Sequence, residues 1–395
     1  MDLDQLTALR AGAGTAALAT ADQLVDTDQL AAASALRAAG IAPDLAAAAL
    51  TQARLRHRAA GKFGSDAAAM LFTRAGLEQA TRRVVADRRA LRLRDAGVRT
   101  LIDLGSGLGA DSLAAARAGI QVHAVEADPV TAAVARHNVE ALGLAERVTV
   151  RCADATTVKL DGYDAAFCDP ARRSGAAGRR VFDPRAYSPP WDFVTSLIDR
   201  VPVVALKVAP GIDHALIPAG AEAEWVSVGG DLVEAAFWCG PVARAPRRAS
   251  VLTDARVAEL TGDGVSAAPV TGVGPYLFDP DPAVVRAHLV AEFATTVGGG
   301  LADERIAYVY ADAPTATPFA QRFAVTDVLP FSLKRLRALL RERGVGRVEI
   351  RKRGSALTPE TLRKQLKLNG DGSASLALTR IGDDPFVLIC QPVPR

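Results

Sequence analysis

Short apolar segments alternate with helical segments between residues 99 and 208, and this alternation constrains the fold more than any other feature of the sequence. Buried strands are expected at 99–104, 121–127, 148–153, 163–168 and 201–208. A helix is expected to begin at Asp128 and Pro129, because an N-capping acid followed by proline is typical of a helix start. Strands that alternate with helices form a parallel sheet with both faces covered. The sequence therefore predicts an α/β fold.

The alternation ends at residues 223–238, which have the pattern of two strands joined by a tight turn. The turn contains Gly229, Gly230 and Asp231 and is too short to hold a crossover helix. The two strands are therefore expected to pair as an antiparallel hairpin. Such a hairpin at the end of a parallel sheet is uncommon among doubly wound folds.

A glycine-rich loop follows the first strand, in the stretch LIDLGSGLGAD (101–111). Gly105, Gly107 and Gly109 leave bare backbone at a strand-to-helix turn, where a ligand can approach closely. Glu126 stands at the end of the second strand, where an acid can accept from ribose hydroxyls. The loop alone fits S-adenosylmethionine and a dinucleotide equally well.

Later features favour S-adenosylmethionine over a dinucleotide. Asp154, in CADA after the third strand, is placed to accept from an adenine amino group. Asp169 and Pro170, in CDPARR, come just after the fourth strand, at the sheet edge where ligands bind in such folds. The terminal hairpin is the third feature, and a dehydrogenase has no use for this combination.

The motifs LIDLGSGLGAD, VEADP, CADA and CDPARR together resemble the successive cofactor and target motifs of class I S-adenosylmethionine-dependent methyltransferases, over residues 65–240. The resemblance implies a seven-stranded Rossmann-like sheet, which includes the terminal hairpin, and an enzyme that uses S-adenosyl-L-methionine. It assigns the methionine part to Asp103 and the glycine loop, the ribose to Glu126 and the adenine to Asp154. The implied cofactor-binding residues are Asp103, Gly105, Ser106, Gly107, Gly109, Glu126, Ala127, Asp154 and Ala155.

The segment GLEQAT (76–81) resembles the part of several nucleic-acid methyltransferases that closes over the cofactor. An ordinary turn of amphipathic helix explains the same residues. Both interpretations remain open from the sequence.

The fourth motif supplies the expected catalytic residues Asp169, Pro170 and Arg172. Methyl transfer from a sulfonium is an in-line displacement, so these residues mainly align the acceptor and take its hydrogen bonds. Amine methyltransferases commonly carry (D/N)-P-P-(Y/F), which this motif matches only in its first two positions. An aromatic side chain from the following loop is a conjectured replacement for the missing ring: Phe182, Tyr187 or Trp191.

The same motif also resembles that of RNA 5-methyluridine methyltransferases, which attack the pyrimidine with a cysteine placed after the fifth strand. The matching place here, LKVAPG (206–211), contains no cysteine, so this mechanism is disfavoured. No metal is needed for methyl transfer, and the five histidines show no ligand spacing.

The net charge of +3 conceals two basic blocks. Residues 54–94 hold eleven Lys or Arg against three Asp or Glu, and residues 331–367 hold twelve against three. Clustered cations favour a polyanion partner, although solvated arginine-rich helices explain each block equally well. Lys207 stands near the end of the fifth strand and either binds phosphate or is a strand-end lysine. The expected substrate-binding residues are Arg173, Arg179, Lys207, Arg351, Lys352 and Arg353.

Four regions are expected along the chain: helical at 1–95, methyltransferase-like at 96–240, a connecting α/β region at 241–325 and a small α+β domain at 326–395. The connecting region is expected to hold a helix at 282–293 and a strand at 306–310. The last region is expected to hold a helix capped by Ser332, a strand, the loop RKRG (351–354), a second helix and two closing strands.

This last region resembles the THUMP-like domain that accompanies such methyltransferases in bacteria, on the stretch LPFSLKRLRALLRERGVGRVEIRKRG. Because THUMP domains bind RNA, the resemblance and the charge together favour RNA as the partner, with a base nitrogen of tRNA or rRNA as acceptor. Two alternatives remain: a small molecule or protein side chain as acceptor, or an RNA-binding protein without enzymatic activity.

The remaining features indicate a cytoplasmic protein. No apolar run is long enough to cross a bilayer, and the start MDLDQL lacks the features of a secretory signal. The four cysteines are scattered and form no C-x-x-C pair, which argues against a disulfide framework or a zinc site and suits a reducing compartment.

Overall fold

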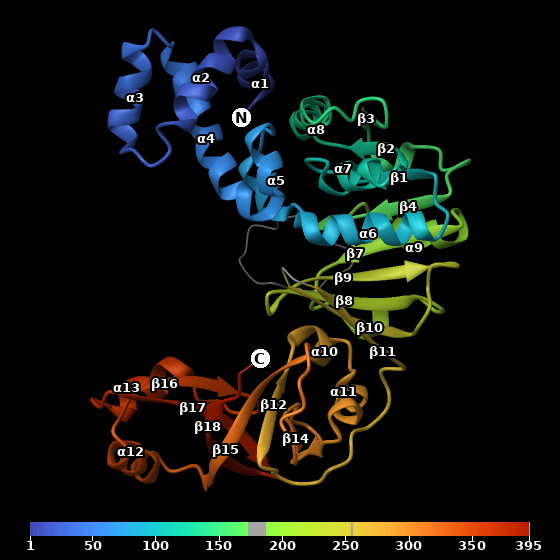
Figure 1. Ribbon diagram of the computed structural model, residues 1–395. Helices are drawn as coiled ribbons and strands as arrows, with labels where there is room; N and C mark the ends of the chain where they lie inside the picture. Colours follow the sequence, from blue (N-terminus) through green and yellow to red (C-terminus); the bar gives the residue numbers. More distant parts are fainter. Residues whose placement is uncertain (173–186, 254–255, 395) are drawn as a thin grey trace. The chain divides into compact units, whose positions relative to one another are not determined.

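The computed structural model describes residues 1–172, 187–253 and 256–394 and divides the chain into two compact units (Figure 1). The first unit consists of Met1–Val208, Asp213–Ala221 and Phe237–Ala243. The second consists of Ala209–Ile212, Glu222–Ala236 and Arg244–Arg395. Each unit buries apolar side chains of its own and is described by itself.

The first unit begins with a helical region, as the sequence predicts. Its helices are α1 (Leu3–Arg10), α2 (Gly12–Asp22), α3 (Gln29–Ala38), α4 (Pro43–Phe63), a 3₁₀ turn (Gly64–Ala68), α5 (Arg74–Gln79) and α6 (Arg83–Asp95). Asp2 and Asp28 accept backbone N–H groups at the starts of α1 and α3 and so satisfy donors that a helix leaves unpaired. The long helix α4 buries Leu50, Ala53 and Phe63 in the core of this region.

A parallel sheet follows. Its strands are β1 (Thr100–Leu104), β2 (Gln121–Glu126), β3 (Val148–Cys152), β4 (Ala165–Cys168) and β7 (Val203–Val208), in the order β3-β2-β1-β4-β7. The helices α7 (Ala110–Arg117), α8 (Pro129–Ala141) and α9 (Trp191–Ser196) lie between the strands along the chain. Asp128 accepts from the Thr131 N–H at 2.7 Å, so the predicted start of α8 is confirmed. Two short strands, β5 (Ala171–Arg172) and β6 (Tyr187–Ser188), pair separately.

The predicted hairpin is present as β8 (Glu222–Val228) and β9 (Asp231–Cys239), which are neighbours in the strand order. Gly229 and Gly230 join them with positive φ angles of 63° and 91°. The sheet is larger than the expected seven strands, because β10 (Arg247–Leu252) pairs parallel to β8 and β11 (Val257–Gly262) pairs with β10, which gives nine strands among the described residues. The sequence missed these two strands because glycine and proline surround them.

A second sheet, of seven strands in the described residues, lies in the second unit. Its elements are β12 (Tyr276–Pro280), α10 (Pro282–Arg286), α11 (Val290–Val297), β13 (Gly300–Leu301), β14 (Val309–Ala311), β15 (Ala320–Pro330), α12 (Leu333–Glu342), β16 (Val345–Lys352), α13 (Pro359–Leu366), β17 (Gly372–Ile381) and β18 (Asp384–Pro392). The strand order is β13-β14-β12-β15-β18-β17-β16. One sheet therefore combines strands from 241–325 with strands from 326–395, and β15 runs through the expected boundary at residue 325.

Three local expectations in this unit need correction. The helix expected at 282–293 is two helices, because the chain turns at His288, which has a φ of 60°. The strand expected at 306–310 begins only at Val309. The first two residues of the expected loop at 351–354 belong to β16, because they continue its parallel pairing with β17.

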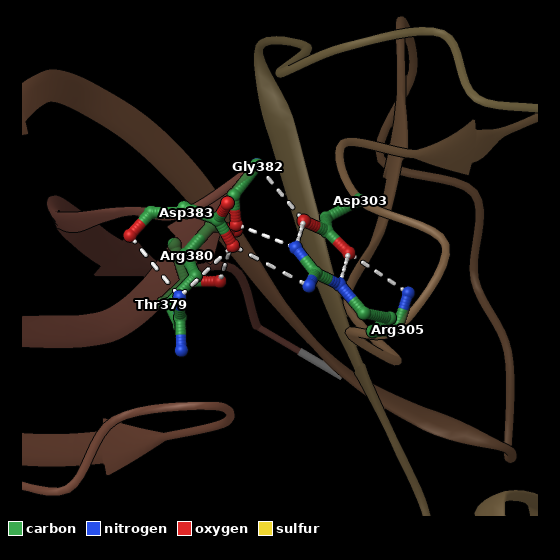
Figure 2. A network of polar contacts seen from close by, with 6 residues as sticks. All are labelled: Asp303, Arg305, Thr379, Arg380, Gly382 and Asp383. Carbon is green, nitrogen blue, oxygen red and sulfur yellow. Dashed lines mark hydrogen bonds and ion pairs between the residues drawn. The ribbon is translucent and has the colours of Figure 1, made fainter.

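A polar network fixes the turn between β17 and β18 (Figure 2). Asp303 accepts from the Gly382 N–H at 2.9 Å and from the Arg305 guanidinium at 3.1 Å. Asp383 forms an ion pair with Arg305 at 3.6 Å and accepts a hydrogen bond from Arg380 at 3.3 Å. The hydrogen bonds from Arg305 lower the pKa of Asp303 to about 2. The network therefore holds this turn through a carboxylate that stays ionised at neutral pH.

Candidate functional site

The glycine loop runs close against the fourth motif. The Gly105 and Ser106 N–H groups both donate to the Val125 carbonyl, at 2.9 and 3.0 Å, which fixes the start of the loop on β2. Gly105 has a φ of 84°, and a Cβ there would lie 3.2 Å from the Asp169 carbonyl oxygen. Only glycine combines this left-handed backbone with such a close approach. Gly107 and Gly109, with φ of 56° and 90°, continue the turn into α7.

Glu126 links the glycine loop to the next turn. One carboxylate oxygen accepts from the Gly107 N–H and the other accepts from the Asp128 N–H, each at 2.9 Å. The next residue, Ala127, follows β2 directly, and its carbonyl faces the Cys152 thiol at 3.8 Å. The acid expected to bind the ribose is therefore held in place by the loop expected to hold the methionine part.

Asp103 is completely buried on β1. Its Oδ2 accepts from the Ser112 hydroxyl, whereas its Oδ1 has no hydrogen-bond partner in the described part of the chain. Burial raises the pKa of Asp103 to about 8, with further repulsion from Asp111 and Asp169, while the Ser112 hydrogen bond opposes the rise. A nearby cation would remove this cost by stabilising the charged carboxylate.

Asp154 caps a 3₁₀ turn, Ala155–Thr157, after β3. Its Oδ1 accepts from the Thr156 N–H and from the Thr156 hydroxyl, each at 2.8 Å. Ala155, beside it, is buried. The side chain expected to bind the adenine is thus oriented by its own turn.

The structure brings Asp169 and Lys207 together. Asp169 follows β4 and Lys207 lies on the neighbouring β7, one position beyond the paired residues Cys168 and Leu206. The Lys207 ammonium lies 2.6 Å from Asp169 Oδ2 and is largely shielded from solvent. The structure thus places this ammonium against the acid expected to orient the acceptor. A phosphate-binding role for Lys207 stays a prediction. The backbone of Arg172 pairs with that of Tyr187.

Three other expected substrate-binding residues lie in the second unit. Arg351 and Arg353 donate to Asp279 on β12, with ion-pair distances of 3.2 and 2.8 Å. Their guanidinium groups also lie over the rings of Phe323 and Tyr308. These two arginines therefore hold the sheet together, and Lys352 is the exposed member of the three. Arg173, Arg179 and Phe182 lie outside the described residues.

Tyr187 and Trp191, two of the aromatic residues conjectured to stack on the acceptor, lie close together. The Tyr187 and Trp191 rings are 5.9 Å apart, and Tyr187 is buried while Trp191 is partly exposed. Their role beside the acceptor stays a prediction.

Sequence reasoning missed a support beneath the glycine loop. Asp111, at the start of α7, accepts from the Arg89 guanidinium at 2.9 Å and from the Thr81 hydroxyl at 2.7 Å. Arg89 is almost fully buried and lies over the Phe167 ring at 4.6 Å. This arginine belongs to the basic block at residues 54–94, so at least one cation of that block is buried in an ion pair inside the protein. Only the position of Asp111, directly after the glycines, marked it in the sequence.

The expected residues fit S-adenosylmethionine. Asp103 Oδ1 and the Ser106 hydroxyl are buried polar atoms without a hydrogen-bond partner in the described residues, and both flank the glycine loop. The ligand's ammonium suits Asp103, and its carboxylate suits a hydroxyl donor such as that of Ser106. Glu126 and Asp154 supply acceptors for hydroxyl and amino groups. Within the described ranges, no group of His, Cys, Asp and Glu has the arrangement of a metal site.

Known proteins resemble this chain in sequence and in fold. A family described as methyltransferase domain matches residues 101–173, THUMP domain-like matches 320–392, and a domain of unknown function matches 2–59. Uncharacterized S-adenosylmethionine-dependent methyltransferases from two strains of Mycobacterium tuberculosis are each 36% identical over 354 residues, which cover 86% of this chain and 95% of the relative. A Porphyromonas gingivalis W83 protein, provisionally named a methyltransferase, has a crystal structure that is 23% identical with a TM-score of 0.74, over 90% of this chain and 92% of that one. This last similarity concerns the fold.

Proposed function

The chain belongs to the S-adenosylmethionine-dependent methyltransferases, and we propose that it methylates a base in RNA, with tRNA or rRNA as the acceptor. The observation that carries the RNA assignment is the THUMP domain-like match at residues 320–392, on a part of the chain that is rich in exposed cations. The family and the cofactor expected from the sequence are thereby confirmed. The acceptor is the proposed part.

The cations available for RNA lie mainly on α12 and α13, which pack against β16. Helix α12 holds four Lys or Arg and one acid, and α13 holds two and one. Both helices bury leucines on one side and leave most of these cations exposed on the other. The exposed cations here are Lys334, Arg335, Arg341, Arg363, Lys364 and, just after α13, Lys367. Such a surface attracts a phosphate backbone without reading its sequence.

The cofactor supplies an activated methyl group on a sulfonium, and the chain's residues align the acceptor with it. We assign Asp169 to the acceptor: its carboxylate accepts a hydrogen bond from an exocyclic amine of the base and so fixes the direction of the attacking nitrogen. Lys207 holds that carboxylate in place, because its ammonium lies 2.6 Å from Asp169 Oδ2. Pro170, buried after Asp169, contributes a carbonyl as a further acceptor.

Comparison of modified nucleosides by mass spectrometry tests this proposal. RNA from cells without the gene is compared with RNA from cells complemented by the wild-type protein, Asp169→Ala or Asp161→Ala. Asp161 is an exposed acid in the turn before β4, so it is a matched control. We expect one methylated nucleoside to disappear without the gene, to return with wild type and Asp161→Ala, and to stay absent with Asp169→Ala. An unchanged profile in every RNA class would refute RNA as the acceptor.

Salt dependence tests the docking surface separately. Replacement of Lys334, Arg335 and Lys364 by glutamine removes cations from α12 and α13, and Arg37→Gln removes an exposed cation from α3 as the control. We expect the slope of log affinity for RNA against log salt to fall by roughly one for each phosphate that the variant no longer neutralises. An unchanged slope in the triple variant would exclude these helices as the RNA surface.

A further inference from the structure

Polar side chains of α4 hold a stretch of backbone outside the sheet, residues 70–81, which we call the covering segment. The Gln52 amide accepts from the Phe72 N–H at 2.9 Å and donates to the Phe72 carbonyl at 2.8 Å. One turn further along α4, Arg56 donates to the Met70 carbonyl at 2.9 Å. Buried backbone groups need such partners, so α4 replaces the strand or helix that would otherwise pair with this backbone.

Lys62, near the end of α4, holds the far part of the covering segment. Its ammonium donates to the carbonyls of Leu77, Glu78 and Ala80, at 2.8, 2.8 and 2.9 Å. An ammonium has three N–H donors, so these carbonyls use all of them. They surround the C-terminal end of α5, where helix carbonyls lack intrahelical partners and a positive charge is favourable.

Lys207 contacts the carbonyl of residue 79, which Lys62 does not bind. Its ammonium lies 3.4 Å from the Gln79 carbonyl while it pairs with Asp169. Four consecutive carbonyls, at residues 77–80, therefore accept from two lysines. Burial, followed by repulsion from Lys207 and Arg82, lowers the pKa of Lys62, so the carbonyl contacts offset a cost that the fold imposes on this ammonium.

The covering segment also packs on the glycine loop. A Cβ on Gly76 would lie 2.7 Å from Leu108 Cγ, which places the segment's backbone directly against the loop. At its end, the Thr81 hydroxyl donates to Asp111 at 2.7 Å. Asn138, on α8, donates to the carbonyls of both Leu71 and Leu108. The order of the glycine loop therefore depends on the order of the covering segment.

We propose that Lys62 is a positioning residue of the cofactor site: by binding the carbonyls of residues 77, 78 and 80, it fixes the covering segment on the glycine loop and raises the affinity for S-adenosylmethionine. The helical region at 1–63 is then part of the cofactor site through α4. This inference concerns the cofactor alone and holds whatever the acceptor is, so RNA methylation is not needed to test it.

The test compares Lys62→Met with Arg58→Met in the full chain. Arg58 is an exposed cation on the same helix, so its loss removes charge without touching the covering segment. Affinity for S-adenosylhomocysteine is measured by calorimetry, and exchange of the amides at 73–81 is measured by mass spectrometry. We expect Lys62→Met to bind on the order of tenfold more weakly, because only a fraction of molecules keep the segment ordered. Exchange at 73–81 should be faster in Lys62→Met, and Arg58→Met should match wild type in both measurements.

Unchanged affinity in Lys62→Met, or an equal loss in Arg58→Met, would overturn the proposal. Weaker binding with unchanged amide exchange at 73–81 would overturn it too, because Lys62 would then act by another route. If Lys62→Met does not fold, Thr81→Val decides the question by the same two measurements. This variant releases the other end of the segment from Asp111 with little change in volume. Normal affinity in Thr81→Val would then count against the proposal.

Discussion

We expect the binding of S-adenosylhomocysteine near pH 7 to release close to one proton, and we expect that proton to come from Asp103. In the free protein this carboxyl is completely buried and keeps one oxygen without a hydrogen-bond partner in the described residues. Burial and the charges of Asp111 and Asp169 raise its pKa to about 8, against the opposing effects of Ser112 and Arg89. An ammonium at this carboxyl favours the ionised form and lowers its pKa.

The size and the pH dependence follow from these values. With a pKa of about 8, Asp103 is protonated in ~0.9 of the free molecules at pH 7 and in ~0.1 at pH 9. If the ligand's ammonium lowers the pKa well below 7, nearly all of that protonated fraction is released on binding. Proton release should therefore be ~0.9 per ligand at pH 7 and should fall as the pH rises through about 8.

Calorimetry in buffers with different heats of ionisation measures the number of protons released. Asp103→Asn cannot ionise, so its binding enthalpy should be the same in every buffer. Asp154→Asn alters the expected adenine end of the site and should keep the proton release even where it weakens binding. Release near zero in the wild-type protein at pH 7, or the same release in Asp103→Asn, would refute the assignment of the ligand's ammonium to Asp103.

Three further predictions concern backbone, packing and pH. Gly105→Ala should lower the free energy of unfolding by about 1–2 kcal/mol, because it places a side chain on left-handed backbone, and it should weaken S-adenosylhomocysteine binding. The control is Gly97→Ala, because Gly97 also has left-handed backbone, with a φ of 86°, and open space around it. In paired melting and binding assays, Gly97→Ala should lower stability and leave binding unchanged. Asp279→Asn should lower the free energy of unfolding in urea by ~2 kcal/mol, because its two guanidinium partners are only 20% and 24% exposed, and a similar loss in the exposed Asp371→Asn would contradict this. Asp303, whose pKa is lowered to about 2, contributes stability that is present above its unfolded pKa and lost as pH falls through about 2; Asp303→Asn should flatten this part of the acid-unfolding curve, and an unchanged curve would exclude the contribution.

Sequence patterns located the parallel strands, the hairpin and the glycine loop because local features encode them. The start of α8 depends on Asp128 and its own N–H partner three residues away. The hairpin depends on two adjacent glycines with positive φ. The same patterns failed at His288, where a non-glycine residue adopts a left-handed backbone and divides a helix. They also failed for β10 and β11, which stand in a stretch rich in glycine and proline and join the sheet through the pairing of β10 with β8.

The expected cofactor residues lie at or just after the carboxyl ends of strands, so the parallel sheet gathers them once its strand order is fixed. The partners of the charged side chains could not be predicted from local sequence. Arg351 and Arg353 stand in a basic stretch of sequence, yet both contact Asp279, more than seventy residues away. For Lys207 the sequence leaves phosphate binding and a strand-end lysine open, and only the fold shows that its position on β7 places it against Asp169.

The sequence by itself determined the α/β alternation, the backbone shape of the glycine loop and the acids that lie in or just after β1 to β4, because hydrophobic period, capping and turn chemistry act over a few residues. Only the tertiary structure decided which charges are free and which are used inside the protein. An ammonium such as that of Lys62 finds its three carbonyls through the packing of α4 against residues 70–81. No local pattern records that packing, because its partners meet only when the chain has folded.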